Sequence, residues 1–302
     1  MLKLVLAFFD IGTVLLLPGL LIKVRQPPAW VLLHAWHPLI VGEVVARGHL
    51  DSVGIFFLVL AMRLLLPTSG LASSRLAAGA SLAASVLAKG YALFTFPFLL
   101  LAARPRQAWF AVGFVTAGVI AYLPFASAGI ELWQGISLYA ARWHGYTAIY
   151  EVVDFLMARF TSNHMLNARR ICAVLFALWL SCLWFRMRKE ENQLSVLDTC
   201  FLSLAGFFLL SPVLYPWYLA WTVPFLCLRC RPVWLLFTGS AFFYYAHHFA
   251  LGRQEIPWVK LAEYGPPLVL TLALLVVRKH GLLSRGAIIR IKRTDFEHEG
   301  NL

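Results

Sequence analysis

Long apolar runs separated by short polar turns make up most of this chain. A membrane-spanning helix needs about 20 mainly apolar residues, and such runs recur from one end of the sequence to the other. No strand-like alternation and no repeat of fixed period stands out, so we predict an all-α, polytopic transmembrane helical bundle of about 9–11 segments. The eleven apolar segments lie near 2–22, 30–46, 52–66, 73–88, 91–103, 107–126, 168–186, 194–211, 216–229, 232–249 and 263–278.

Two of these segments, 91–103 and 216–229, are short for a full crossing. They are therefore interpreted as tilted helices, re-entrant segments or halves of a broken helix that lines a cavity. With no linker that divides the sequence, 1–278 is predicted to be a single transmembrane domain, followed by a basic cytoplasmic tail over 279–302.

The connection 127–167 is much longer than an ordinary loop between packed helices. Within it, Leu132, Tyr139 and Trp143 recur at helical spacing, which predicts amphipathic helices that lie at the membrane interface. An aromatic stripe of this kind is more often an interfacial anchor than a ligand platform.

Composition and charge support a membrane location. Of 302 residues, 61% are hydrophobic and 13% are charged, whereas an ordinary soluble domain has about 25% charged residues. The net charge of +12 could indicate nucleic acid, but the basic residues are distributed by loop, so no nucleic-acid partner is expected. The positive-inside bias places on the cytoplasmic side Lys23, Arg25, Arg63, Arg75, Arg104, Arg106, Arg186, Arg188, Lys189, Arg229, Arg231 and the C-terminal tail, which would rest on membrane lipids.

The five cysteines lie in or at the ends of apolar runs, which argues against a secreted disulfide framework. Cys227 and Cys230 form one CxxC, for which apolar packing is a better interpretation than a metal or redox role. Sequence motifs of soluble enzymes are absent, so any chemistry is sought among polar groups at membrane depth. No cofactor is indicated with certainty, and a divalent metal is left open.

Ionisable groups inside apolar runs cost roughly 2.5–3.5 kcal/mol to insert, so each one is a functional hypothesis. Asp10 lies in the middle of an apolar run and is either a site residue or a helix-packing residue bonded to Thr13 or to a neighbouring helix. Glu43 is spaced to form an i, i+4 surface pair with Arg47. Lys89 either extends to the outer interface or neutralises a phosphate.

Two further stretches on the outer side combine polar and aromatic residues. His49 and Asp51 are two positions apart and can converge on one ligand from a turn. Tyr215, Trp217 and Tyr218, in the proline-rich SPVLYPWYLAW, form either an interfacial belt or the wall of a groove for a lipid or sugar, with the belt favoured.

Five blocks together resemble bacterial integral-membrane glycosyltransferases of the GT-C class, the polyprenol-phosphate-dependent mannosyltransferases and their relatives. The blocks are LKLVLAFFD, WHPLIVGEVVARGHLD, LAKGYALFTFP, YAARWHGYTAIYEVV and LLSPVLYPWYLAW, in this order over nearly the whole chain. The sequence departs from the family pattern at His37, where the family usually has Asn, and at Tyr215, where it usually has His.

The resemblance implies an enzyme of the bacterial inner (cell) membrane that transfers a hexose such as mannose from a polyprenyl-phosphate sugar to a lipid or glycan acceptor on the outer face. It implies a substrate-binding set of His49, Asp51, Lys89, Trp143, Tyr215, Trp217 and Tyr218. Lys89 is the candidate for the donor phosphate, and Asp51 and Glu43 are the candidates for the catalytic carboxylate that would act as the base in an inverting transfer.

The family's principal catalytic aspartate lies in a first outer loop, upstream of these blocks, and no carboxylate precedes Asp10 here. We therefore expect a shortened chain that lacks the N-terminal part with the base and is inactive alone. Two other classes stay open: a transporter or flippase of a lipid-linked intermediate, and a non-catalytic membrane subunit.

Overall fold

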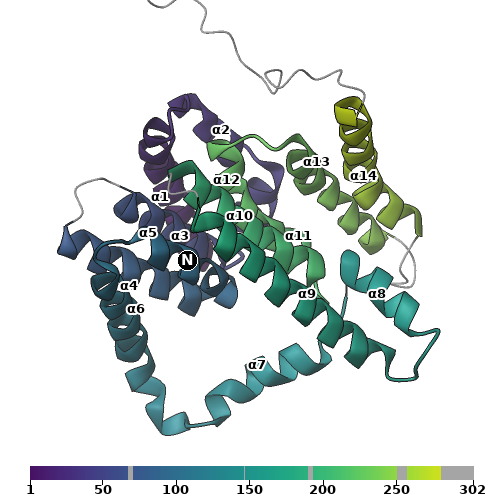
Figure 1. Ribbon diagram of the computed structural model, residues 1–302, viewed down its shortest axis with the longest axis horizontal. Helices are drawn as coiled ribbons and strands as arrows, with labels where there is room; N and C mark the ends of the chain where they lie inside the picture. Colours follow the sequence, from purple (N-terminus) through teal and green to yellow (C-terminus); the bar gives the residue numbers. More distant parts are fainter. Residues whose placement is uncertain (67–70, 146, 190–192, 250–256, 280–302) are drawn as a thin grey trace, which may run out of the picture. The chain divides into compact units, whose positions relative to one another are not determined.

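The computed structural model describes residues 1–66, 71–145, 147–189, 193–249 and 257–279. Within these ranges every regular element is a helix (Figure 1). One isolated bridge pairs Gly145 with Val213. The predicted all-α fold is thus confirmed. The predicted tail, 279–302, lies outside the described residues except for Lys279.

The contacts divide the chain into two compact units, Met1–Arg231 and Pro232–Leu302, which are described separately. The second unit contains α13 (Pro232–Ser240), η6 (Ala241–Phe249) and α14 (Pro257–Lys279). In it, the Ser240 hydroxyl donates to the carbonyl of Glu263 at 2.6 Å and so joins α13 to α14.

The first unit begins with helices whose bounds follow the predicted apolar runs closely. They are α1 (Leu2–Lys23), η1 (Pro28–Val31), α2 (Leu32–Ala35), η2 (Ile40–Ala46), α3 (Asp51–Leu65), α4 (Ala72–Ala88), η3 (Gly90–Thr95), α5 (Phe96–Ala102) and α6 (Gln107–Tyr122). Helix α3 packs between α1 and α4, and α4 packs in turn on α6.

Small residues let α4 and α6 approach each other closely. A Cβ added at Gly79 would stand 2.0 Å from the carbonyl oxygen of Phe110, and one added at Gly113 would stand 2.0 Å from that of Leu76. Backbone contact of this kind is a common way to join helices in a membrane, where lipid weakens the hydrophobic drive to associate.

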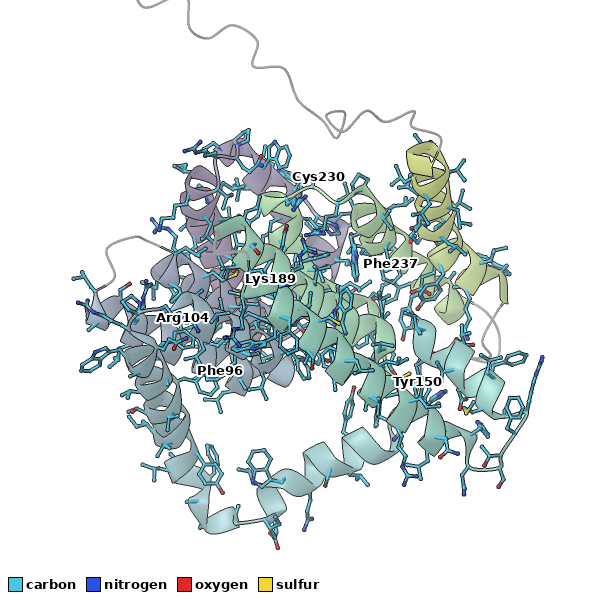
Figure 2. All side chains as sticks on the ribbon, viewed as in Figure 1. Phe96, Arg104, Tyr150, Lys189, Cys230 and Phe237 are labelled. Atoms are coloured by element: carbon cyan, nitrogen blue, oxygen red, sulfur yellow. The ribbon has the colours of Figure 1, made fainter. Side chains whose placement is uncertain are left out.

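The rest of the first unit starts with the long predicted connection. The elements of this remaining part of the unit are η4 (Leu123–Ala128), α7 (Glu131–Arg142), α8 (Ile149–Met157), α9 (His164–Met187), α10 (Gln193–Leu210), α11 (Pro216–Leu219), η5 (Ala220–Thr222) and α12 (Val223–Leu228). The connection therefore contains helices, as predicted, and α7 is largely exposed. Helix α8 packs on α9 through Tyr150, which is fully buried against Ala168 and Cys172 (Figure 2).

In the part of the chain that the structure describes, four helices are long and apolar enough to cross a membrane by length and composition: Leu2–Lys23, Gln107–Ala128, His164–Met187 and Trp258–Val277. A fifth candidate is the pair Pro28–Ala35 and Ile40–Ala46, bent by 63°. Gly90–Ala102 and Pro216–Leu228 are short, as the sequence indicates. These helices make the chain a membrane protein. The larger number of about 9–11 predicted segments stays a prediction beyond these four or five.

Candidate active site

Asp51 is the centre of a polar cluster in the first unit. It is the first residue of α3, and only 1% of the residue is exposed. Both carboxylate oxygens lie 2.9 Å from Lys89 Nζ, and the indole Nε1 of Trp221 donates to Oδ1 at 2.6 Å. Burial of a carboxylate is costly unless it is paired and hydrogen-bonded, and Asp51 meets both conditions.

A break between two helices directs Lys89 toward Asp51. Helix α4 ends at Ala88, and Lys89 itself is extended, with φ −166° and ψ 122°, before η3 begins at Gly90. The pairing with Asp51 is a contact that neither sequence interpretation of Lys89 includes, and the phosphate role stays a prediction. The Lys89 side chain nevertheless remains 27% exposed.

Trp221 reaches Asp51 because residue 54 is a glycine. A Cβ at Gly54, almost one turn after Asp51 on α3, would stand 2.3 Å from Cη2 of Trp221. The carbonyl of Gly54 accepts a hydrogen bond of 2.6 Å from Ser85, which ties α3 to α4 at the same level. A small residue on α3 therefore creates the space that the indole occupies.

Aromatic rings surround the Lys89 ammonium. Nζ lies 4.5 Å from the ring centroid of Tyr218 and 5.3 Å from that of Tyr91, which are cation–π distances. The hydroxyls of Tyr218 and Tyr139 are 2.7 Å apart, so α7 of the long connection also contacts the cluster. Burial raises the pKa of the Tyr139 phenol, although its hydrogen bond to Tyr218 acts in the opposite direction.

Glu43 and His49 form a second part of the cluster. Glu43 lies in η2, a π-helical segment of a kind that often occurs at functional sites, and it is fully buried. Its Oε2 lies 3.3 Å from His49 Nε2, and its Oε1 lies 3.9 Å from Arg47 Nε. The predicted pair with Arg47 exists, but the surface location was wrong: the π-helical segment packs Glu43 inward.

The imidazole of His49 continues into a stack of aromatic rings. It stacks on Trp217 with centroids 4.6 Å apart and planes at 13°, and Trp217 stacks on Tyr215 at 4.5 Å and 13°. Trp217 also meets Tyr218 edge-on at 5.8 Å. Tyr215, Trp217 and Tyr218, which we call the aromatic wall, thus connect the Glu43–His49 pair to the Asp51–Lys89 pair.

The long connection reaches this wall through the hydroxyl of Tyr139, which meets that of Tyr218, and Trp143 joins it through Tyr139. Trp143 stacks on Tyr139 at 5.4 Å, and its carbonyl accepts a hydrogen bond of 3.0 Å from Arg169 on α9. Two residues later, the Gly145 N–H donates to the carbonyl of Pro212 at 3.2 Å. All seven residues of the predicted substrate-binding set, together with Glu43, therefore belong to one connected cluster.

Asp10 takes part in a different pair. Its Oδ1 lies 3.0 Å from Nε2 of His34, which is fully buried. The predicted bond between Asp10 and Thr13 was wrong, because the Thr13 hydroxyl donates to the carbonyl of Phe9 one turn earlier on α1. The alternative, a residue of a neighbouring helix, is the arrangement observed.

Sequence reasoning missed Trp221, Tyr91, Tyr139 and Gly54 as members of the cluster. Trp221 had a usable signal, since it follows Trp217 by four positions and Tyr218 by three and so shares a helical face with them. Gly54 had none, because its role depends on a side chain from a distant part of the chain.

A metal site gains no support from the described part of the chain, where no group of three or more His, Cys, Asp and Glu side chains is placed to hold an ion. The two carboxylates of the cluster face cationic or histidine partners.

Comparison with known families adds one match. Residues 147–238 match the MptB C-terminal domain. This match supports a relationship to a mannosyltransferase-like membrane family. The matched region supplies the aromatic wall and Trp221, whereas Glu43, His49, Asp51 and Lys89 precede it. Neither the curated proteins nor the solved structures gave a significant match to the chain.

Proposed function

We propose that this chain is an integral-membrane glycosyltransferase that transfers a hexose, such as mannose, from a polyprenyl-phosphate sugar to a lipid or glycan acceptor on the outer face of the bacterial inner membrane. The observation that carries the proposal is the meeting of His49, Asp51 and Lys89 with an aromatic wall that lies within the MptB-like region. Aromatic faces suit a sugar ring or an isoprenoid, and an ammonium suits a phosphate.

Lys89 is the proposed contact for the donor phosphate. An ammonium has three N–H donors, and two of them serve the oxygens of Asp51, which leaves one for a phosphate oxygen at the exposed side of Lys89. In this role Asp51 positions Lys89 and is not the base, because Lys89 and Trp221 occupy its oxygens.

His49 is the proposed group that meets the acceptor hydroxyl. Glu43 is fully buried, whereas the His49 side chain is 30% exposed and lies 3.3 Å from the Glu43 carboxylate. His49 would accept the hydroxyl proton while the acceptor oxygen bonds to the anomeric carbon and the polyprenyl phosphate departs, and Glu43 would stabilise the resulting imidazolium. This dyad is an alternative to a base supplied from a region upstream of Met1.

The experiment supplies membranes that contain the chain with labelled polyprenyl-phosphate mannose and follows label transfer to lipid or glycan products. Lys89→Ala and His49→Gln should each lower the rate about 100-fold or more. The matched control is His164→Gln, since His164 pairs with Asp154 at 2.8 Å and is no part of the cluster. Transfer that is unaffected by both site variants would refute the assignment.

Assays with the same membranes also distinguish the proposed enzyme from a transporter or flippase and from a non-catalytic membrane subunit. Transfer that depends on Lys89 but is insensitive to His49→Gln would mean that a group other than His49 is the base. Movement of the labelled donor across vesicles without transfer would favour a transporter or flippase. Absence of both activities would favour a non-catalytic membrane subunit.

A further inference from the structure

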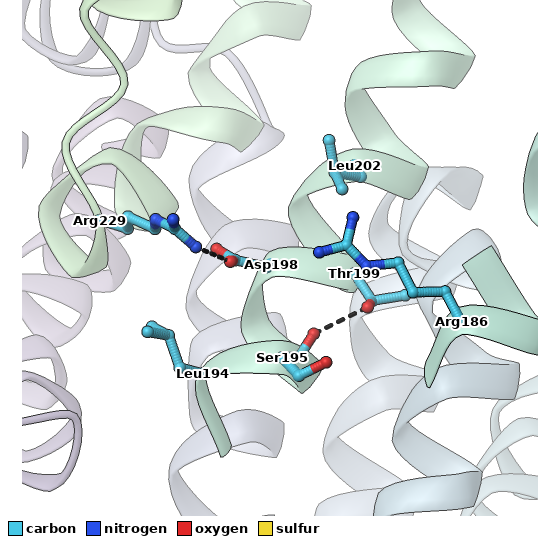
Figure 3. A pocket seen from close by; sticks show the side chains of 7 residues that line it. All are labelled: Arg186, Leu194, Ser195, Asp198, Thr199, Leu202 and Arg229. Carbon is cyan, nitrogen blue, oxygen red and sulfur yellow. Dashed lines mark hydrogen bonds and ion pairs between the residues drawn. The ribbon is translucent and has the colours of Figure 1, made fainter. Parts of the chain in front are cut away.

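A second charged cluster lies in the first unit, where the end of α9 meets the start of α10 and the segment after α12. Arg229 Nη1 and Arg231 Nη2 each donate to a different oxygen of Asp198, the latter at 2.6 Å. Arg186, in the last turn of α9, lines the same cleft, which has a volume of about 120 Å³ (Figure 3). We call this the arginine cleft.

Positive charge predominates in the arginine cleft. Of the residues that line the cleft, Arg186 and Arg229 are cationic and Asp198 is anionic. The guanidinium of Arg231, which does not line the cleft, bonds the same carboxylate from beside it. Burial lowers the pKa of Arg231, and the like charges of Arg229 and Arg186 lower it further, while Asp198 opposes them. An additional anion would relieve this repulsion.

Arg231 has an unused donor and a fixed position. Its Nε is buried and has no hydrogen-bond partner in the described part of the chain, and its guanidinium carbon lies 4.2 Å from the ring centroid of Phe201. By contrast, the Arg229 side chain is 52% exposed and so accessible to a ligand. Arg231 is thus held in place by Phe201 and Asp198, beside Arg229, which also bonds Asp198 but is more exposed.

We propose that the arginine cleft binds a phosphate group, carried by an anionic membrane phospholipid. Guanidinium groups bind phosphate oxygens in a bidentate manner, and basic pockets between membrane helices are suited to lipid headgroups. A lipid source fits the location, because Arg186 stands at the end of the candidate span His164–Met187 and the cleft is also lined by Leu194 and Leu202, which suit an acyl chain. The proposal does not depend on the glycosyltransferase assignment.

The test measures binding of phosphatidylglycerol to the purified full chain by native mass spectrometry, with phosphatidylcholine as the neutral lipid. The double variant Arg186→Gln with Arg229→Gln should weaken phosphatidylglycerol binding about tenfold or more, since each basic residue near a lipid surface contributes about 1 kcal/mol. The control is Arg188→Gln, which removes a charge just after α9 from a residue that does not line the cleft. Its binding should match the wild type.

Asp198→Asn provides a test in the opposite direction. Loss of the competing carboxylate should strengthen phosphatidylglycerol binding, so the prediction holds even if the double arginine variant fails to fold. Unchanged or weaker binding by a monodisperse Asp198→Asn protein would overturn the proposal, as would wild-type binding by a folded double variant. Inorganic phosphate is the second probe: if it displaces phosphatidylglycerol at equal concentration, the occupant is a free phosphate and the lipid assignment is wrong.

Discussion

Asp51 and Asp198 are two carboxylates of the first unit in opposite surroundings. Asp51 is sealed by one lysine, an indole and aromatic rings, and its charge is balanced by Lys89. The Asp198 side chain is 15% exposed, and arginines outnumber it. A balanced, enclosed pair holds side chains in fixed positions, whereas an unbalanced, open cluster is suited to attract a ligand.

The largest expected difference between the two carboxylates is in stability. Asp51→Asn should reduce the free energy of unfolding by about 3 kcal/mol, because it leaves Lys89 beside a neutral group in a largely buried site. Asp198→Asn should cost about 1 kcal/mol or less, since its partners are partly solvated. Unfolding in detergent measures both, and equal losses would remove the distinction between an enclosed and an open cluster.

The next largest effect concerns the glycine that admits Trp221. Gly54→Ala should destabilise the protein by about 1–3 kcal/mol, because the added methyl overlaps the indole, and transfer activity should fall with it. The control is Gly118→Ala on α6, where nothing lies within 4 Å of an added Cβ. Equal unfolding midpoints for the two variants would contradict the close approach of Trp221 to α3.

A smaller effect is expected where the long connection contacts the cluster. Tyr139→Phe should cost about 0.5–1.5 kcal/mol, the usual net value of one hydrogen bond. In a double-mutant cycle with Tyr218→Phe, the two losses should be less than additive, because either change alone removes the same bond. Strict additivity would mean that the hydroxyls do not interact.

The smallest expected effect is that of salt concentration, which should act on the arginine cleft and hardly at all on the Asp51–Lys89 pair. Raising NaCl from about 0.05 to 0.5 M shortens the screening length severalfold, so phosphatidylglycerol binding at the arginine cleft should weaken. The stability lost in Asp51→Asn should change little, because the Asp51 carboxylate is almost fully buried. If salt reduces the Asp51→Asn loss as strongly as it reduces lipid binding, the Asp51 pair is open to water.

The fold was predictable from the sequence to a large extent, because the apolar runs that mark α1 or α9 are local signals. The substrate-binding set was predicted through the block resemblance, and the structure adds how its members contact one another. What local patterns could not give are contacts between distant parts of the chain: Trp221 bonds Asp51 across 170 positions, and Lys89 bonds it across 38. The burial of Glu43 was missed for a related reason, since a π-helical segment changes the residue spacing assumed for an ordinary helix.

That π-helical segment, Ile40–Ala46, also limits how related sequences can vary. Its backbone hydrogen bonds reach five residues back, as from the Arg47 N–H to the Gly42 carbonyl, so removal of one residue here would change the winding of the segment that leads to His49 and Asp51. His49 and Asp51 would then leave Trp217 and Lys89 even though no site residue had changed. The number of residues between His37 and His49 is therefore as much a requirement of the site as their identities, and alignments of relatives should tolerate substitutions in this interval but not gaps.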